Sequence, residues 1–166
     1  MPEARSEGIA ELYARHVADA GRLAYFLVGD TRLAEDMVQD AFIRVFARWQ
    51  HLRNPDAFWA YLCRTLVNLS RKHFRRQRVE RAFLLRHGGS QDVAGDAPPD
   101  AAGRDELWRA LQTLPTRQRT ALVLRFFADL SESQTADLMR CSVPAVNSLV
   151  ARGLVSMRSL IPAEEE

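Results

Sequence analysis

The sequence has a single lysine, Lys72, against 22 arginines, so nearly all of its positive charge lies on guanidinium groups. These groups bind phosphates and carboxylates through a planar, bidentate fork. Cysteine is also scarce: Cys63 and Cys141 are the only two, and they lie 78 positions apart with no C-x-x-C pattern. This excludes a disulfide framework and a zinc site of the usual spacing, and it fits a reducing compartment.

Long apolar runs are missing. The longest, around residues 121–127, is interrupted by Arg125 and falls far short of the ~18 apolar residues that span a bilayer. No basic segment followed by an apolar one suggests a secretion signal. We therefore expect a soluble, cytoplasmic protein without membrane insertion.

The sequence also lacks the patterns of common catalytic and metal sites. Four histidines, His16, His51, His73 and His87, show no metal-ligand spacing, and no glycine-rich loop of the phosphate-binding type occurs. Neither cysteine has a base close to it in the sequence. The sequence predicts no catalytic residue, no metal and no cofactor, and an enzyme is the poorest interpretation.

Charge is divided unevenly behind a formal net charge of +2. The basic and acidic side chains number 14 and 10 in residues 1–85, 2 and 5 in residues 86–106, and 7 and 6 in residues 107–166. The chain therefore has a basic first part, an acidic middle and a mildly basic end.

The acidic middle predicts a domain boundary. Residues 88–104 are rich in Gly, Pro, Ala and Asp and poor in large apolar residues, so they cannot bury a core. They predict a flexible linker between a domain at residues 1–87 and a domain at residues 105–166. Each part is near the lower size limit for a hydrophobic core of its own.

Both parts are predicted to be helical, which gives an all-α fold class of two small domains. In the first part, apolar residues recur at three- and four-residue spacing over residues 9–27, over 33–49 and from Phe58 onward. The second part predicts helices over residues 105–114, 116–128, 131–139 and 142–160.

The helix predicted over residues 33–49 has an apolar arc of roughly 220° and a narrow polar stripe. Ile43 lies within this stripe, among Asp36, Gln39 and Asp40. One exposed isoleucine is ordinary on any surface. The alternative is a partner-binding face with Ile43 at its centre, and such a partner would present basic residues.

The helix that begins near Phe58 carries a basic stripe. Its members recur at i, i+4, i+7, i+8 and i+11, with one further arginine, and are Arg64, Asn68, Arg71, Lys72, Arg75 and Arg76. Such a stripe is typical of a surface that follows a phosphate backbone, and Asn68 can bond a base edge. Trp59 either stacks on an unpaired base or packs within the domain. The alternative for the stripe is a solvated helix face.

Residues 131–149 have the spacing of a helix-turn-helix motif, which lays its second helix in the major groove of DNA. Ser131 and Ser142 are predicted to cap its helices. Arg140 occupies the turn position where glycine is expected, at a cost of roughly 1 kcal/mol. The candidate DNA contacts of the second helix are Ser142, Asn147, Ser148 and Arg152. An ordinary helical hairpin is the alternative.

Taken in order, these motifs resemble those of the extracytoplasmic-function (ECF) sigma factors of bacterial RNA polymerase, which are group 4 of the sigma-70 family, in particular the actinobacterial type. Similarity to their region 2 lies in Leu12-Tyr13, Leu27-Val28-Gly29-Asp30, residues 34–42 and residues 64–69 with the arginines that follow. Similarity to their region 4 lies in residues 114–119, residues 122–126 and the helix-turn-helix.

The resemblance implies a sequence-specific transcription initiation factor that binds core RNA polymerase and directs it to promoters. It implies that Asp36, Gln39, Asp40 and Ile43 dock on the polymerase. It further implies that the −10 element is read by Trp59, Arg64, Asn68, Arg71, Lys72, Arg75 and Arg76, and the −35 element by the helix after Ser142. An anti-sigma factor is a further partner that the resemblance leaves open.

The sequence departs from the family in the −35 helix. Where these factors usually have Gly-Thr-Val-Lys-Ser-Arg, this chain has Pro144-Ala145-Val146-Asn147-Ser148-Leu149, so two commonly basic positions are Asn and Leu. The alternative function is therefore a sigma-like helical interaction protein with weakened or lost −35 recognition.

Overall fold

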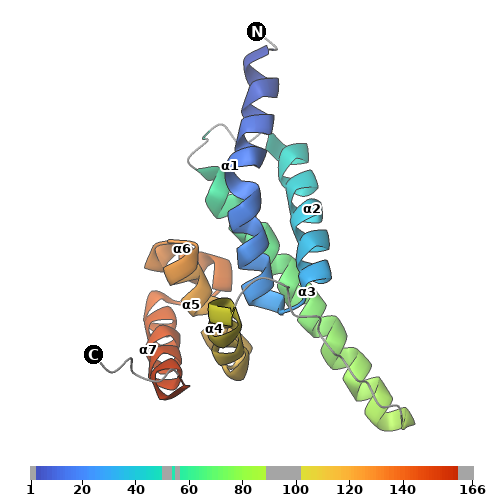
Figure 1. Ribbon diagram of the computed structural model, residues 1–166, viewed down its shortest axis with the longest axis vertical. Helices are drawn as coiled ribbons and strands as arrows, with labels where there is room; N and C mark the ends of the chain where they lie inside the picture. Colours follow the sequence, from blue (N-terminus) through green and yellow to red (C-terminus); the bar gives the residue numbers. More distant parts are fainter. Residues whose placement is uncertain (1–2, 50–53, 55–56, 89–101, 161–166) are drawn as a thin grey trace.

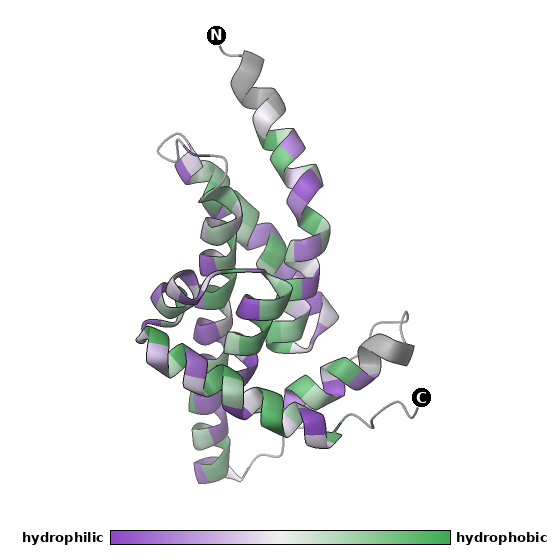
Figure 2. Ribbon diagram, turned by 90° about the vertical axis from the view of Figure 1, so that its left-hand side faces the viewer, coloured by the Kyte–Doolittle hydropathy of each residue, from purple (hydrophilic) through white to green (hydrophobic). Residues whose placement is uncertain are grey.

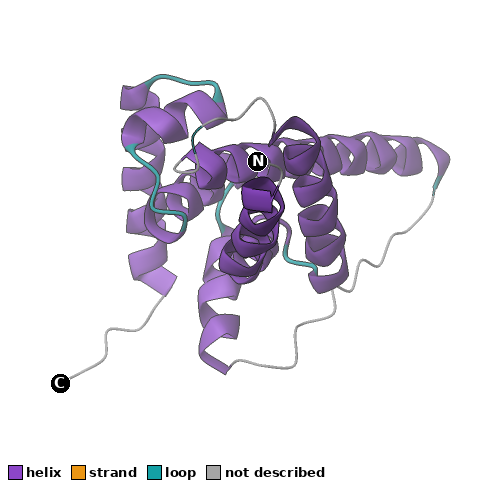
Figure 3. Cartoon of the chain, turned by 90° about the horizontal axis from the view of Figure 1, so that it is seen from above, coloured by secondary structure: helices purple, strands orange, loops and turns teal. Residues whose placement is uncertain are grey.

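The computed structural model describes residues 3–49, 54, 57–88 and 102–160. Every regular element in these residues is a helix (Figure 3), which confirms the all-α prediction. None of the described helices is long and apolar enough to cross a membrane. The predicted linker lies mostly outside the described residues, so its conformation and the exact domain boundaries stay predictions.

Three helices form the first domain (Figure 1). They are α1 (Glu3–Val28), α2 (Thr31–Arg48) and α3 (Phe58–His87). Gly29, with φ of 73°, ends α1, and the Asp30 carboxylate then accepts a hydrogen bond of 3.0 Å from the backbone N–H of Leu33. This Asp30 cap starts α2 directly after α1, and the two helices pack side by side.

The core of this domain is built from the apolar stripes of the three helices. Leu23, Leu27, Phe42, Phe58 and Leu62 are among its buried side chains. A group of aromatic rings closes the end near the start of α3, where Phe42, Phe46 and Trp49 surround Phe58. The first half of α3 is therefore fixed by the core.

The second half of α3 leaves the core. This 30-residue helix is about 45 Å long at 1.5 Å per residue, and its final turns project away from the other helices (Figure 1). Hydrophilic and hydrophobic residues alternate along this end (Figure 2), and Val79, Phe83 and Leu85 are exposed. Gly88, with φ of 74°, ends the helix.

The second domain contains α4 (Ala102–Thr113), α5 (Thr116–Leu122), the π-helical turn η3 (Val123–Phe127), α6 (Glu132–Met139) and α7 (Val143–Leu160). The helix predicted over residues 116–128 is thus an α-helix whose last turn widens to π geometry. The backbone N–H of Ala128 bonds the carbonyl of Val123, five residues earlier, at 3.0 Å.

The two domains pack against each other. The α4–α7 group lies beside α1 and the first half of α3 (Figure 1), and one continuous cluster of buried apolar residues runs through both domains. The sequence predicts two domains but contains no signal for this packing.

Candidate functional site

The outer face of α2 carries the predicted polymerase contacts. Asp36, Gln39 and Ile43 are exposed, and 69% of Ile43 remains accessible although it is a large apolar residue. Asp40 is half-buried, and its carboxylate accepts a hydrogen bond of 3.0 Å from Nε of Arg44. Three of the four predicted side chains are therefore exposed on one helix face, while the fourth is paired within α2.

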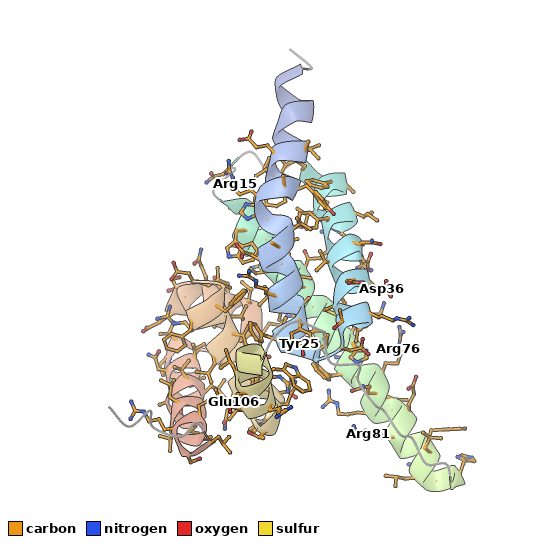
Figure 4. The ribbon with its side chains drawn as sticks, viewed as in Figure 1. Arg15, Tyr25, Asp36, Arg76, Arg81 and Glu106 are labelled. Carbon is orange, nitrogen blue, oxygen red and sulfur yellow. The ribbon has the colours of Figure 1, made fainter. Side chains whose placement is uncertain are left out.

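The basic stripe of α3 is largely at the surface. Its exposed members are Arg64, Asn68, Lys72, Arg75 and Arg76. Figure 4 shows Arg76 on the same side of the molecule as Asp36 of α2. Among the described residues, no ion pair joins any of these four cations to a carboxylate. The stripe is therefore available to an anionic partner over several turns of helix.

Arg71 and Trp59, two further members of the predicted −10 surface, are half-buried and bond the second domain. The Arg71 guanidinium donates a hydrogen bond of 2.9 Å to the carbonyl oxygen of Leu138. The Trp59 indole N–H donates one of 2.8 Å to the carbonyl oxygen of Ala128. Of the two interpretations that the sequence allows for Trp59, this conformation has the packed one.

Burial shapes the electrostatics of this junction. It lowers the pKa of Arg71, and the nearby charges of Arg140 and Arg117 lower it further. The pKa of His16 is lowered by burial and by Arg15, against an opposing effect of Asp19. A neutral imidazole suits its position, because the His16 ring stacks on Trp59 at 5.4 Å.

Cys63 is buried within the first domain, and burial raises the pKa of its thiol far above the ordinary value. The thiol therefore stays protonated at neutral pH and is a poor nucleophile. No group of three or more histidine, cysteine, aspartate or glutamate side chains in the described part of the chain has the geometry to hold a metal ion.

Helices α6 and α7 form the predicted helix-turn-helix motif. Ser131 caps α6 in a capping box, because its hydroxyl accepts from the N–H of Gln134 at 3.1 Å while the Gln134 side chain accepts from the Ser131 N–H at 2.9 Å. The Ser142 hydroxyl accepts from the N–H of Ala145 at 3.2 Å. Arg140 has φ of 53° and ψ of 48°, a left-handed conformation. The predicted caps and the strained turn are confirmed.

The predicted −35 contacts lie on the outer side of α7. Ser142, Asn147, Ser148 and Arg152 are all exposed. Asn147 makes one long contact of 3.5 Å to the carboxylate of Glu132, and the hydroxyl of Ser142 is already used as the helix cap. Arg152 is therefore the one cation among these four side chains.

Sequence reasoning missed Gly153 in α7. A Cβ there would lie 2.7 Å from Cδ1 of Leu122, so glycine allows α7 and α5 to approach closely. A glycine inside an otherwise regular helical pattern was the available signal.

Comparison with known proteins identifies the chain. Residues 12–80 match the family model described as Sigma-70 region 2, and residues 104–157 match Sigma-70, region 4. The RNA polymerase sigma-E factor of Streptomyces coelicolor is 30% identical over 156 residues, which are 93% of this chain and 87% of that protein. The chain therefore belongs to the sigma-70 family of RNA polymerase sigma factors.

Within this family the chain is of the ECF type. The ECF RNA polymerase sigma factor SigE of Mycolicibacterium smegmatis is 31% identical over 91% of this chain and 60% of its own length. The resemblance stated from the motifs is confirmed, and so is the function as a transcription initiation factor that directs RNA polymerase to promoters.

Solved structures agree on the fold. The sigma factor RpoE from Bartonella quintana, in complex with the anti-sigma factor NepR, superposes with a TM-score of 0.68 at 20% identity, covering 99% of this chain and 100% of that one. CnrH, in complex with the cytosolic domain of CnrY, gives a TM-score of 0.62 at 26% identity, covering 95% and 89% of the two chains.

Proposed function

We propose that this sigma factor uses three separate surfaces, one for each of its contacts. The outer face of α2 binds core RNA polymerase, the stripe on α3 binds the −10 element, and α7 faces the −35 element. The domain at residues 1–87 thus joins the enzyme to the −10 element, and the domain at residues 105–166 acts upstream. The protein works in the cytoplasm and has no catalytic step of its own.

The polymerase contact rests on one observation above the others, the exposure of Ile43 on a polar helix face. Burying an isoleucine side chain against a partner stabilises a complex by about 1.5–3 kcal/mol. Asp36 and Gln39 flank it and supply polar groups for a rim. The matching polymerase surface would have an apolar pocket bordered by basic side chains.

A charge at the centre of this face tests the assignment. Ile43→Glu should weaken binding to core RNA polymerase by about 100-fold, because apolar burial is lost and a carboxylate must be desolvated in its place. Fluorescence anisotropy with labelled sigma factor and purified core enzyme measures this change.

Leu85→Glu is the matched control, since Leu85 is 85% exposed at the free end of α3 and the change is again from an aliphatic side chain to glutamate. The control should bind like the wild type. Wild-type affinity in Ile43→Glu would contradict the assignment of the α2 face.

The −10 contact is supported by the continuity of the α3 stripe. Arg64, Lys72, Arg75 and Arg76 are exposed cations suited to phosphates, and Asn68 is exposed among them with an amide that can pair with a base edge. A surface with many cations and one amide suits a nucleic acid, because contacts to its phosphate backbone supply most of the binding free energy.

A second candidate function is favoured by α7, where Arg152 is the one cation among the four predicted contacts and the Ser142 hydroxyl already caps the helix. The candidate is a sigma-like protein whose −35 recognition is weak or lost. In vitro transcription from a random promoter library distinguishes this candidate from a sigma factor that reads both promoter elements. Enrichment of both elements supports standard recognition, and enrichment of a −10 motif alone supports weakened recognition.

Polymerase binding without any enriched promoter motif would contradict promoter recognition by this chain and leave an interaction protein. An anti-sigma factor belongs among the proposed partners, because the similar RpoE structure is a complex with one. Such a protein would bind the chain more tightly when DNA and core enzyme are absent than when they are present.

A further inference from the structure

Helix α7 presents an amide group at the place where a helix-turn-helix motif reads DNA. In such a motif, residues near the start of the second helix contact base edges in the major groove. Asn147 is the fifth residue of α7, so it lies about 6 Å along the helix axis from the first residue. Its side chain is exposed and therefore accessible to a base.

Packing on α5 determines which side of α7 is exposed. Val146 is fully buried, and Gly153 lies seven residues further along the same stripe of the helix. A Cβ on Gly153 would lie 2.7 Å from Cδ1 of Leu122, so this stripe is held closely against α5. Asn147 follows Val146 and lies about 100° around the helix, outside the stripe. Its exposure is therefore a consequence of how the domain packs.

The Asn147 amide is only weakly engaged within the chain. Its Nδ2 lies 3.5 Å from a carboxylate oxygen of Glu132, the first residue of α6. This distance is at the limit of hydrogen bonding, and both side chains are exposed. Exchanging the contact for a bond to a base therefore costs little free energy.

The neighbouring side chains discriminate poorly between bases. Pro144 and Ala145 have no hydrogen-bonding group, and the Ser142 hydroxyl already caps α7. The Ser148 hydroxyl both donates and accepts, so it bonds to more than one kind of base. Arg152 lies more than one helical turn beyond Asn147, where a phosphate contact is expected. The Asn147 amide, with its donor and acceptor in one plane, is the best reader at this end of α7.

We propose that Asn147 is the specificity-determining residue of α7 and that it selects an adenine in the −35 element. Its Oδ1 accepts from the N6 amino group, and its Nδ2 donates to N7 of the same base. Guanine presents two acceptors at the corresponding positions, so it cannot satisfy the amide in this way. The inference rests on the proposed function in one respect, that α7 faces the −35 element.

An amide at this position separates specificity from affinity. The family pattern usually has a lysine where this chain has Asn147, so α7 has one fewer charge for phosphates. Phosphate contacts add affinity for any sequence, whereas a bidentate bond to a base adds affinity for one sequence only. We therefore infer that α7 binds its element weakly overall but depends strongly on one base pair.

In vitro transcription with core RNA polymerase and a barcoded promoter library tests this assignment. The library keeps constant the −10 element that the wild-type chain prefers and randomises the −35 segment. The wild-type chain should enrich adenine at one −35 position, and any other base there should lower transcription about tenfold.

Two substitutions of Asn147 have different expected results. Asn147→Ala should lose the preference at that position and keep the preferences at other positions. Asn147→Asp should replace adenine by cytosine at the same position, because a carboxylate accepts from the cytosine N4 amino group and cannot donate to N7. A merely structural role of Asn147 would not exchange one base for another.

Ser159→Ala is the matched control, since Ser159 is an exposed polar residue in the last turn of α7 outside the predicted contacts. It should give the wild-type base profile. Circular dichroism shows whether each variant retains its helices. Asn147→Asp, which preserves the size of the side chain, keeps the test decisive if the alanine variant unfolds.

The inference and the proposed function fail in different ways. An adenine preference that persists in Asn147→Ala and Asn147→Asp would overturn the inference, and so would an Asn147-dependent preference for another base. Both results leave −35 recognition by α7 intact. If the wild-type chain enriches no base in the −35 segment, α7 does not read this element. The −35 part of the proposed function is then wrong, and the inference falls with it.

Discussion

Arg140 combines an unfavourable backbone conformation with an unfavourable charge. Its φ of 53° costs a residue with a Cβ about 1–2 kcal/mol, and its charge acts on the half-buried Arg71. We expect Arg140→Gly to raise the free energy of unfolding by about 1 kcal/mol or slightly more, measured by urea denaturation.

Arg140→Ala separates the two causes, because it removes the charge and keeps the Cβ. It should stabilise the chain less than glycine does. Equal stability of the alanine and glycine variants would show that the backbone conformation contributes nothing.

Lys72 allows a test of a single phosphate contact on the α3 stripe. If its ammonium neutralises one phosphate, Lys72→Ala should lower the slope of log affinity against log salt concentration by about one unit for duplex promoter DNA bound with core polymerase. Titrations at several salt concentrations measure the slope. Arg109→Ala is the control, since Arg109 is an exposed cation on α4 outside all three surfaces, and an unchanged slope in Lys72→Ala would assign that position to solvent.

At the residue scale, the sequence is sufficient to predict the hydrogen bonds that a side chain makes to residues close to it in the chain. The Asp30, Ser131 and Ser142 caps bond backbone groups three residues away, so local spacing predicts them. The bond from Trp59 to Ala128 joins residues 69 positions apart, and no local rule selects that carbonyl. The structure confirms that Ile43 is exposed on the polar face of α2, and its role as a partner contact stays a prediction.

Among the elements, α3 is unusual because its two halves are stabilised differently. Leu62 and Leu66 are fully buried, whereas Val79, Phe83 and Leu85 are exposed on the projecting end. Helices without tertiary contacts are only marginally stable in water. Amide hydrogen exchange should therefore be slow around residues 62–70 and much faster over residues 78–87, as measured by mass spectrometry of peptic peptides.

The two segments serve as controls for each other, because they belong to one continuous helix. Equal protection along α3 would show that another part of the chain covers its end. A loss of protection over residues 62–70 as well would show that the first domain opens as a whole.

Helical periodicity predicted most elements because each helix of this chain buries one face. It could not predict the π-helical turn after Leu122, since a single widened turn does not alter the apolar pattern of residues 116–128 enough to be recognised. Val123 and Leu124 are both buried, so neighbouring residues of η3 pack inward together. This turn packs against α1 and α6, and the sequence of the helix alone does not contain these contacts.

At the scale of the whole molecule, composition predicted two domains and missed their contact. Residues 88–104 separate two helical blocks in the sequence, but Phe26 and Phe127 bring the blocks together from positions about 100 residues apart. Contacts of this kind depend on single side chains and leave no periodic pattern. The family match does not predict the contact between the domains either, because regions 2 and 4 are matched as separate segments.

The continuous apolar cluster has a calorimetric consequence. Because buried residues of both domains belong to one cluster, melting either domain exposes apolar surface of the other. The wild-type chain should therefore melt in a single cooperative transition, with a calorimetric enthalpy equal to the van't Hoff enthalpy. Phe127→Ala should melt in two transitions, and a wild-type thermogram that already contains two would show that the domains are thermodynamically independent.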